Sequence, residues 1–212
     1  EAEEKVRYLE SHPPIVQDGN NIHIGRIEDE ELRRNISISY EIVTPADTRL
    51  HAHSGSGSVR AANLSREAEV STGSGSIELD GIGGGVRAST GSGSIRASRV
   101  AGGFTGRTGS GNVEVDHTAA GNDEIDTGSG SVEVRGLRGS LRVRTGSGGI
   151  RAQGEPGGDW RMHTGSGTIT VHLPPQAAFE LQARTSSGHG RTTHENTVEG
   201  ILSPRELHGK AR

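Results

Sequence analysis

The chain has 212 residues, of which 34 are glycine and only 2% are aromatic, so an ordinary globular core of large side chains is disfavoured. With 27 acidic and 23 basic residues its formal charge is −4, which gives no reason to expect nucleic acid as a partner. The absence of cysteine excludes a disulfide framework and thiolate metal sites. No apolar run approaches the roughly 18 residues of a membrane span.

The first part of the chain carries a pattern of its own. Residues 1–10 favour a short helix, which His12-Pro13-Pro14 ends, and residues 18–21 (Asp-Gly-Asn-Asn) favour a turn between two strands. Apolar residues then alternate from Ile36 to Val43, which predicts a further strand. We expect residues 1–49 to form a helix-and-strand segment that caps the first coil of the repeats that follow.

An internal repeat occupies the middle of the chain. Gly-Ser-Gly recurs every 18 or 19 residues, in phase with flanking apolar residues, whereas a flexible linker has no reason to keep such a phase. We assign its first glycines to structural turns, because glycine accepts positive φ and lets coils approach closely. These turn glycines are Gly55, Gly73, Gly91, Gly109, Gly128, Gly146 and Gly165.

Alternating apolar residues flank each turn and predict two short strands per period. The residue two places after the motif is always aliphatic: Val59, Ile77, Ile95, Val113, Val132, Ile150 and Ile169. A second alternating pair precedes the motif, so each period contains two strands, a corner and a turn. The sequence predicts an all-β, parallel β-solenoid of about eight coils over residues 50–190. Residues 191–212 are then a C-terminal extension or an incomplete last coil, with a poorly capped edge.

A ladder of alternating charge lies on the outward side of these strands. Opposite charges fall on neighbouring coils at most steps, and such pairs specify register because a slip by one coil would stack like charges. The ladder runs through Arg60, Glu78, Arg96, Glu114, Glu133 and Arg151. A structural role for these residues is our first interpretation, and a partner-binding face is the alternative.

Three other groups of residues raise the question of a site. The threonines before each turn, from Thr72 to Thr164, resemble an exposed hydroxyl array. Each lies two and four residues after the inward positions of its strand, and this even spacing predicts that the threonines point inward and bond turn amides. His51 and His53 share a strand face without an obvious third metal ligand. The coil with the 19-residue spacing, which we call the irregular coil, carries two local groups of acids: Asp116 beside His117, and Asp123 with Glu124 and Asp126. They are a weak candidate for catalysis, and we expect them in solvated turns.

Asp123 also interrupts an apolar column, next to Phe104 on the preceding coil. We expect a local bulge at Asp123 rather than a buried, unpaired carboxylate, which would be costly.

The chain resembles the bacterial putative-adhesin family of β-strand-repeat proteins, a family of unknown function. The resemblance rests on Tyr8-Leu9-Glu10, on Gly-Asn-Asn-Ile-His-Ile at residues 19–24, on the segment 36–45, and on the tandem Thr-Gly-Ser-Gly-Ser-Ile repeats. It implies a right-handed β-solenoid that is usually exported or attached to the cell envelope and has no established catalytic residues.

These observations favour a non-enzymatic, extracytoplasmic β-solenoid that acts as a structural or adhesive surface module. We predict no catalytic, cofactor-binding or metal-binding residues, and as partner a component of the cell envelope or surface. The chain begins at Glu1 without an initiator methionine, so we expect a processed portion of a longer product, with its export signal outside this chain. One alternative is a subunit that stacks head to tail into filaments. The other is a polysaccharide-acting β-helix enzyme.

Overall fold

The computed structural model describes residues 2–25, 27, 29–33, 38–175, 179–193, 202–203 and 206–211. The chain divides into two compact units, residues 1–43 and residues 44–212. Among the described residues no helix is long and apolar enough to cross a membrane.

The N-terminal unit contains the expected helix and hairpin. Helix α1 spans Ala2–Ser11, and β1 (Ile15–Asp18) pairs antiparallel with β2 (Asn21–Ile24) through a turn in which Gly19 has a φ of +56°. A short helix α2 spans Glu30–Arg33. The strand expected from Ile36 to Val43 is wrong for residues 38–43, which form no strand, and Ile36 lies outside the described residues.

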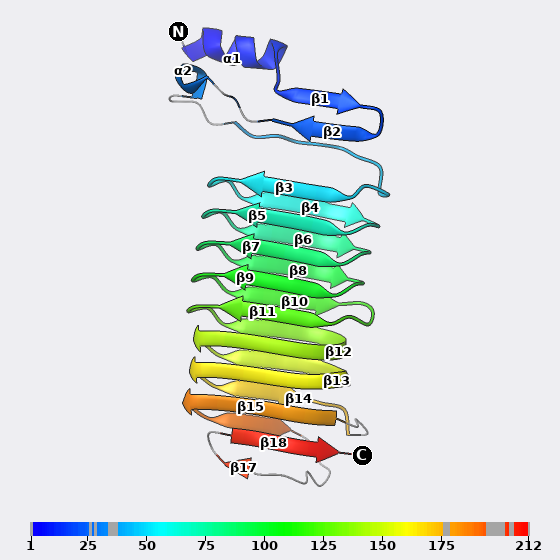
Figure 1. The fold of residues 1–212 in the computed structure, drawn as a ribbon, viewed down its shortest axis with the longest axis vertical. Coiled ribbons are helices and arrows are strands. Elements are labelled where there is room, and N and C mark those ends of the chain that lie inside the picture. Colours follow the sequence, from blue (N-terminus) through cyan, green and yellow to red (C-terminus); the bar gives the residue numbers. More distant parts are fainter. Residues whose placement is uncertain are drawn as a thin grey trace. The chain divides into compact units, whose positions relative to one another are not determined.

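The second unit is a parallel β-solenoid with two sheet faces (Figure 1). The first face contains β3 (Leu50–Ser54), β5 (Ala68–Thr72), β7 (Val86–Thr90), β9 (Phe104–Thr108), β11 (Asp123–Thr127), the C-terminal halves of β12 (Val132–Ser147) and β13 (Ile150–Ser166), and β15 (Phe179–Ser187). The second face contains β4 (Val59–Leu64), β6 (Ile77–Ile82), β8 (Ile95–Val100), β10 (Val113–His117), the N-terminal halves of β12 and β13, β14 (Ile169–His172) and β16 (Gly190–Thr193).

The strands stack in the register that the repeat predicts. Ile77 lies between Val59 and Ile95, and Val86 lies between Ala68 and Phe104, so equivalent positions form columns through the stack. The inward columns of both faces form one continuous apolar core. The buried indole of Trp160 donates its Nε1–H to the carbonyl of Gly139 at 2.9 Å, so this large side chain leaves no unpaired donor.

Eight strand levels on each face make about seven complete turns in the described part of the chain, close to the eight coils expected. The right-handed sense remains a prediction that rests on the family resemblance.

The C-terminal edge differs from its prediction on the first face. Strand β18 (Glu206–Ala211) pairs antiparallel with β15, from Phe179 opposite Ala211 to Arg184 opposite Glu206. It also pairs with β17 (Leu202–Ser203) as a hairpin. The expectation of a poorly capped edge is wrong there, because an antiparallel strand needs no further Gly-Ser-Gly turn to satisfy the ladder hydrogen bonds of β15.

Candidate functional site

The threonines before the turns have their hydroxyls bound inside the protein. Thr90 is buried; its Oγ1 donates to the carbonyl of Gly75 on the preceding coil at 2.8 Å and accepts the amide N–H of Gly93 at 3.1 Å. An equivalent hydrogen bond joins a threonine hydroxyl to the carbonyl of a turn glycine on the preceding coil at Thr72, Thr108, Thr127, Thr145, Thr164 and Thr185. The parity prediction is confirmed, and these hydroxyls form no exposed ligand array.

The predicted turn glycines lie in register where successive turns touch. A Cβ built on Gly91 would overlap the carbonyl oxygen of Gly73, and the equivalent overlap occurs at Gly73, Gly109, Gly128, Gly146 and Gly165. Gly55, in the first turn, has open space instead. The positive-φ part of the expectation is wrong for this motif: left-handed φ values occur elsewhere, for example at Gly81 and Gly136 in the corners. Close approach is therefore the reason for glycine in the turns.

The predicted charge ladder lies on the second face, and its members pair across strands. Arg60 Nε lies 2.9 Å from Glu78 Oε2, and Arg96 Nη2 lies 2.8 Å from Glu114 Oε2. Glu114 and Glu133 face each other, so two like charges meet at one step. Arg135, which lies outside the predicted ladder, reduces the repulsion at this step because it lies 2.9 Å from each carboxylate.

The ladder continues with Arg151, whose Nη1 lies 3.8 Å from Glu133. Burial acts to raise the pKa of Glu114, but hydrogen bonds from Arg135 and Arg96 and their charges outweigh it and lower that pKa. The arginines and glutamates of the ladder therefore neutralise one another on this face.

The acids of the irregular coil are divided between the two faces and the core, and of these acids Glu124 and Asp126 share the outward side of β11. Asp116 is exposed at the end of β10 on the second face, whereas Glu124 is half-buried on β11 of the first face. All five residues of this group lie on strands β10 and β11, so the expected turn is wrong, and Asp123 and His117 are buried rather than solvated.

Asp123 and His117 form a buried pair. His117 Nε2 lies 2.8 Å from Asp123 Oδ2, both side chains are fully buried, and the amide of Phe104 donates to Asp123 Oδ1 at 3.1 Å. His117 Nδ1 is buried without a hydrogen-bond partner. Burial raises the pKa of Asp123, against the lowering effect of His117 and of the Phe104 amide.

The bulge expected at Asp123 is absent, because Asp123 stays in register between Phe104 and Leu141. The register shift lies instead between β10 and β8, where β8 contains the left-handed residue Arg99 (φ +53°) and β10 has no equivalent residue. His117 thereby occupies the corner column that Leu64, Ile82 and Val100 fill on the preceding coils.

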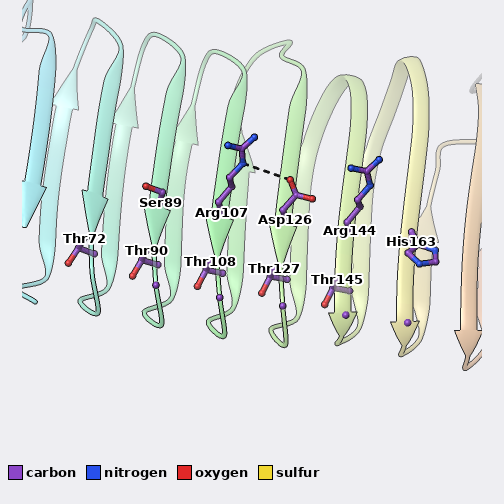
Figure 2. A pocket seen from close by; sticks show the side chains of 15 residues that line it. Thr72, Ser89, Thr90, Arg107, Thr108, Asp126, Thr127, Arg144, Thr145 and His163 are labelled. Atoms are coloured by element: carbon purple, nitrogen blue, oxygen red, sulfur yellow. Dashed lines mark ion pairs between the residues drawn. The ribbon is translucent and has the colours of Figure 1, made fainter. Parts of the chain in front are cut away.

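The first face carries a basic patch near its C-terminal end. We define it as the outward-facing side chains of three adjacent strands: Arg142 and Arg144 of β12, Arg161 and His163 of β13, and Arg184 of β15. A groove of about 640 Å³ runs across the strands and is lined at one end by Arg144 and His163 of this patch. Figure 2 shows Arg107, Asp126, Arg144 and His163 along it, with the Arg107–Asp126 pair at 3.9 Å.

The two histidines of the first strand level make side-chain contacts rather than a metal site. His51 Nδ1 lies 3.5 Å from Glu69, and His53 Nδ1 lies 2.8 Å from Ser71 Oγ. The residues that the structure describes contain no group of three side chains able to hold a metal ion.

A stack of short parallel coils with a continuous aliphatic core defines a β-solenoid repeat protein. The Toastrack DUF4097 family matches residues 36–203, and the chain belongs to this family. Neither curated proteins nor solved structures give a significant match. The family match supports a β-repeat protein and does not extend to adhesion.

Proposed function

We propose that this chain is a non-enzymatic, extracytoplasmic surface module with a structural or adhesive role. The observation that carries the proposal is the continuous in-register stack, which holds rows of outward side chains at a spacing of about 4.8 Å. A solenoid of this kind presents an extended surface to which a long partner can bind at several levels. The partner we propose is a component of the cell envelope or surface.

The distribution of acids supports a non-enzymatic role. Hydrolysis of a polysaccharide needs two carboxyl groups that flank the scissile bond, with an acid of suitable pKa. Asp116 and Glu124 face outward from different faces, and the Asp123 carboxylate is sealed in the core beside His117. Asp126 shares the first face with Glu124, but its carboxylate pairs with Arg107. A polymer cannot reach that carboxylate without local unfolding of the coil.

Localisation of the full-length product in the cells that make it tests the proposal. We expect protease added to intact cells to digest the module, while a cytoplasmic marker stays intact. Beads coated with the purified chain should bind isolated envelopes more than beads coated with a neutral control protein. A module that is protected in intact cells and degraded only after lysis would contradict the extracytoplasmic assignment.

A further inference from the structure

Between β12, β13 and β15, positive side chains of the basic patch lie opposite one another, whereas on the second face opposite charges pair across strands. On the second face, arginines of the ladder lie opposite glutamates and pair with them. In the patch, Arg142 lies directly opposite Arg161 on the next strand, and His163 lies between Arg144 and Arg184. Like charges directly opposite one another on a sheet are destabilising. The register of the solenoid does not require this arrangement.

Two guanidinium groups of the patch are available to a ligand. Within the described part of the chain, Arg142 and Arg144 make no ion pair and no side-chain hydrogen bond, and both are exposed. Arg161 pairs with Asp159. On the β11 side, Arg142 lies opposite Glu124 and Arg144 lies opposite Asp126, but neither arginine forms an ion pair there, and Asp126 pairs with Arg107.

We propose that the basic patch binds an acidic polysaccharide whose carboxylates lie across β12, β13 and β15 along the solenoid axis. Planar guanidinium groups bind carboxylates through paired hydrogen bonds, and an anionic chain would remove the repulsion between Arg142 and Arg161. The groove continues from the patch past Arg144 toward Arg107 and Ser89, whose polar groups can bond sugar hydroxyls. The ligand class deepens the proposed surface role and rests on it for its biological setting.

Two other polyanions fit the patch less well. Single-stranded nucleic acids are held by stacking on large aromatic side chains as well as by charge, and the outward positions that form the patch hold no Phe, Tyr or Trp. Membrane-surface binding needs an apolar face beside the cations, and the large apolar side chains exposed in the described residues all lie between Val6 and Val43.

Binding of polygalacturonate, a linear polymer with one carboxylate per sugar, tests the inference on the full chain. We expect saturable binding that weakens with added salt and that is lost when the carboxylates of the polymer are methyl-esterified. The double variant Arg142→Gln/Arg144→Gln should bind about tenfold more weakly, because two solvent-exposed charge pairs with the polymer are lost, each worth about threefold in affinity. Its melting temperature should stay unchanged or rise, since repulsion within the patch decreases.

The matched control is Arg60→Gln/Arg96→Gln, which removes the same charge from the second face. We expect it to bind polygalacturonate as the unmodified chain does, within about twofold. Equal weakening in both double variants would overturn the inference, as would equal binding of the esterified polymer. Tighter binding to duplex DNA or to vesicles rich in anionic lipid would overturn it too. Cytoplasmic localisation with polygalacturonate binding intact would refute the surface role alone.

Discussion

At the scale of single residues, the pair of His117 and Asp123 is the main departure from the repeat. Two polar side chains replace apolar ones in two different columns of the same coil, and each is the other's hydrogen-bond partner. Burying one of them alone would leave an unsatisfied polar group, which costs about 1 to 3 kcal/mol. The two substitutions are therefore energetically coupled.

Replacing both residues tests this coupling. We expect His117→Leu/Asp123→Leu to unfold at an equal or higher denaturant concentration, because well-packed apolar groups often match or exceed a buried polar pair. Asp123→Leu alone should lower the free energy of unfolding by about 1 to 3 kcal/mol, since His117 then loses its partner. Urea unfolding followed by circular dichroism measures both values. Additive effects of the two single substitutions would contradict the coupling.

The raised pKa of Asp123 predicts how this carboxyl contributes to stability as the pH changes. Between the unfolded pKa, about 4, and the higher folded value, the native state holds a proton that the unfolded state releases. The contribution of Asp123 is therefore largest below about pH 4 and falls as the pH rises through that window.

Unfolding free energies of the unmodified chain and of Asp123→Asn, measured from pH 4 to pH 7, isolate this contribution. We expect the unmodified chain to lose stability relative to the variant as the pH rises. A relative gain with rising pH would mean that attraction to His117 outweighs burial. Exposed carboxylates with lowered pKa, such as Asp47 beside Arg66, act in the opposite direction but cancel in the comparison.

The turn glycines allow a matched comparison within one motif. Gly91→Ala places a methyl group against the carbonyl of Gly73, and we expect it to lower stability by about 1 to 3 kcal/mol through overpacking. Gly55→Ala adds the same group in open space, so its effect should be within about 1 kcal/mol and can be stabilising. Thermal unfolding of both variants checks the difference. Equal losses would show that close approach to the neighbouring turn is not what selects glycine at Gly91.

At the scale of elements, β18 determines whether the C-terminal end of the first face can associate. An exposed edge strand presents unpaired N–H and C=O groups to other chains, and β18 covers that edge of β15. The poorly capped end that motivated the filament hypothesis is therefore absent on this face. On the second face, β16 pairs with β14 alone among the described strands.

Removal of residues 202–212 tests the role of β18. We expect the full chain to elute as a 22.1 kDa monomer at every concentration, and the truncated chain to form dimers or larger species. Size-exclusion chromatography with light scattering distinguishes these outcomes. Filaments of the full chain would restore the head-to-tail hypothesis, whereas a monomeric truncated chain would show that β15 is protected in another way.

At the scale of the whole molecule, the apolar core lies within the second unit. Its buried members run from Leu64 to Ala183, and the partly buried residues that extend it begin at Leu50. Repeat proteins derive stability from the coils and from contacts between neighbouring coils. A chain of residues 44–212 should therefore fold on its own, with a strand-type circular dichroism spectrum and a cooperative thermal transition. Loss of that transition would show that residues 1–43 are required for folding.

The solenoid, its period, the inward columns and the charge pairing along the second face can all be predicted from the amino-acid sequence. Those features are local: an alternation of two within a period of 18 or 19 places equivalent residues at one register, so their neighbours follow from counting. The charge ladder and the inward threonines follow from the same counting.

The features that depart from the repeat depend on three-dimensional packing. His117 meets Asp123 because β10 lacks the corner residue of its neighbours, which turns the imidazole inward. Strand β18 pairs antiparallel with β15, and the repeat pattern does not predict this pairing. Arg135 bridges Glu114 and Glu133 from a neighbouring column. In each case the contact joins residues at non-equivalent positions of the repeat, and three-dimensional packing alone brings such positions together.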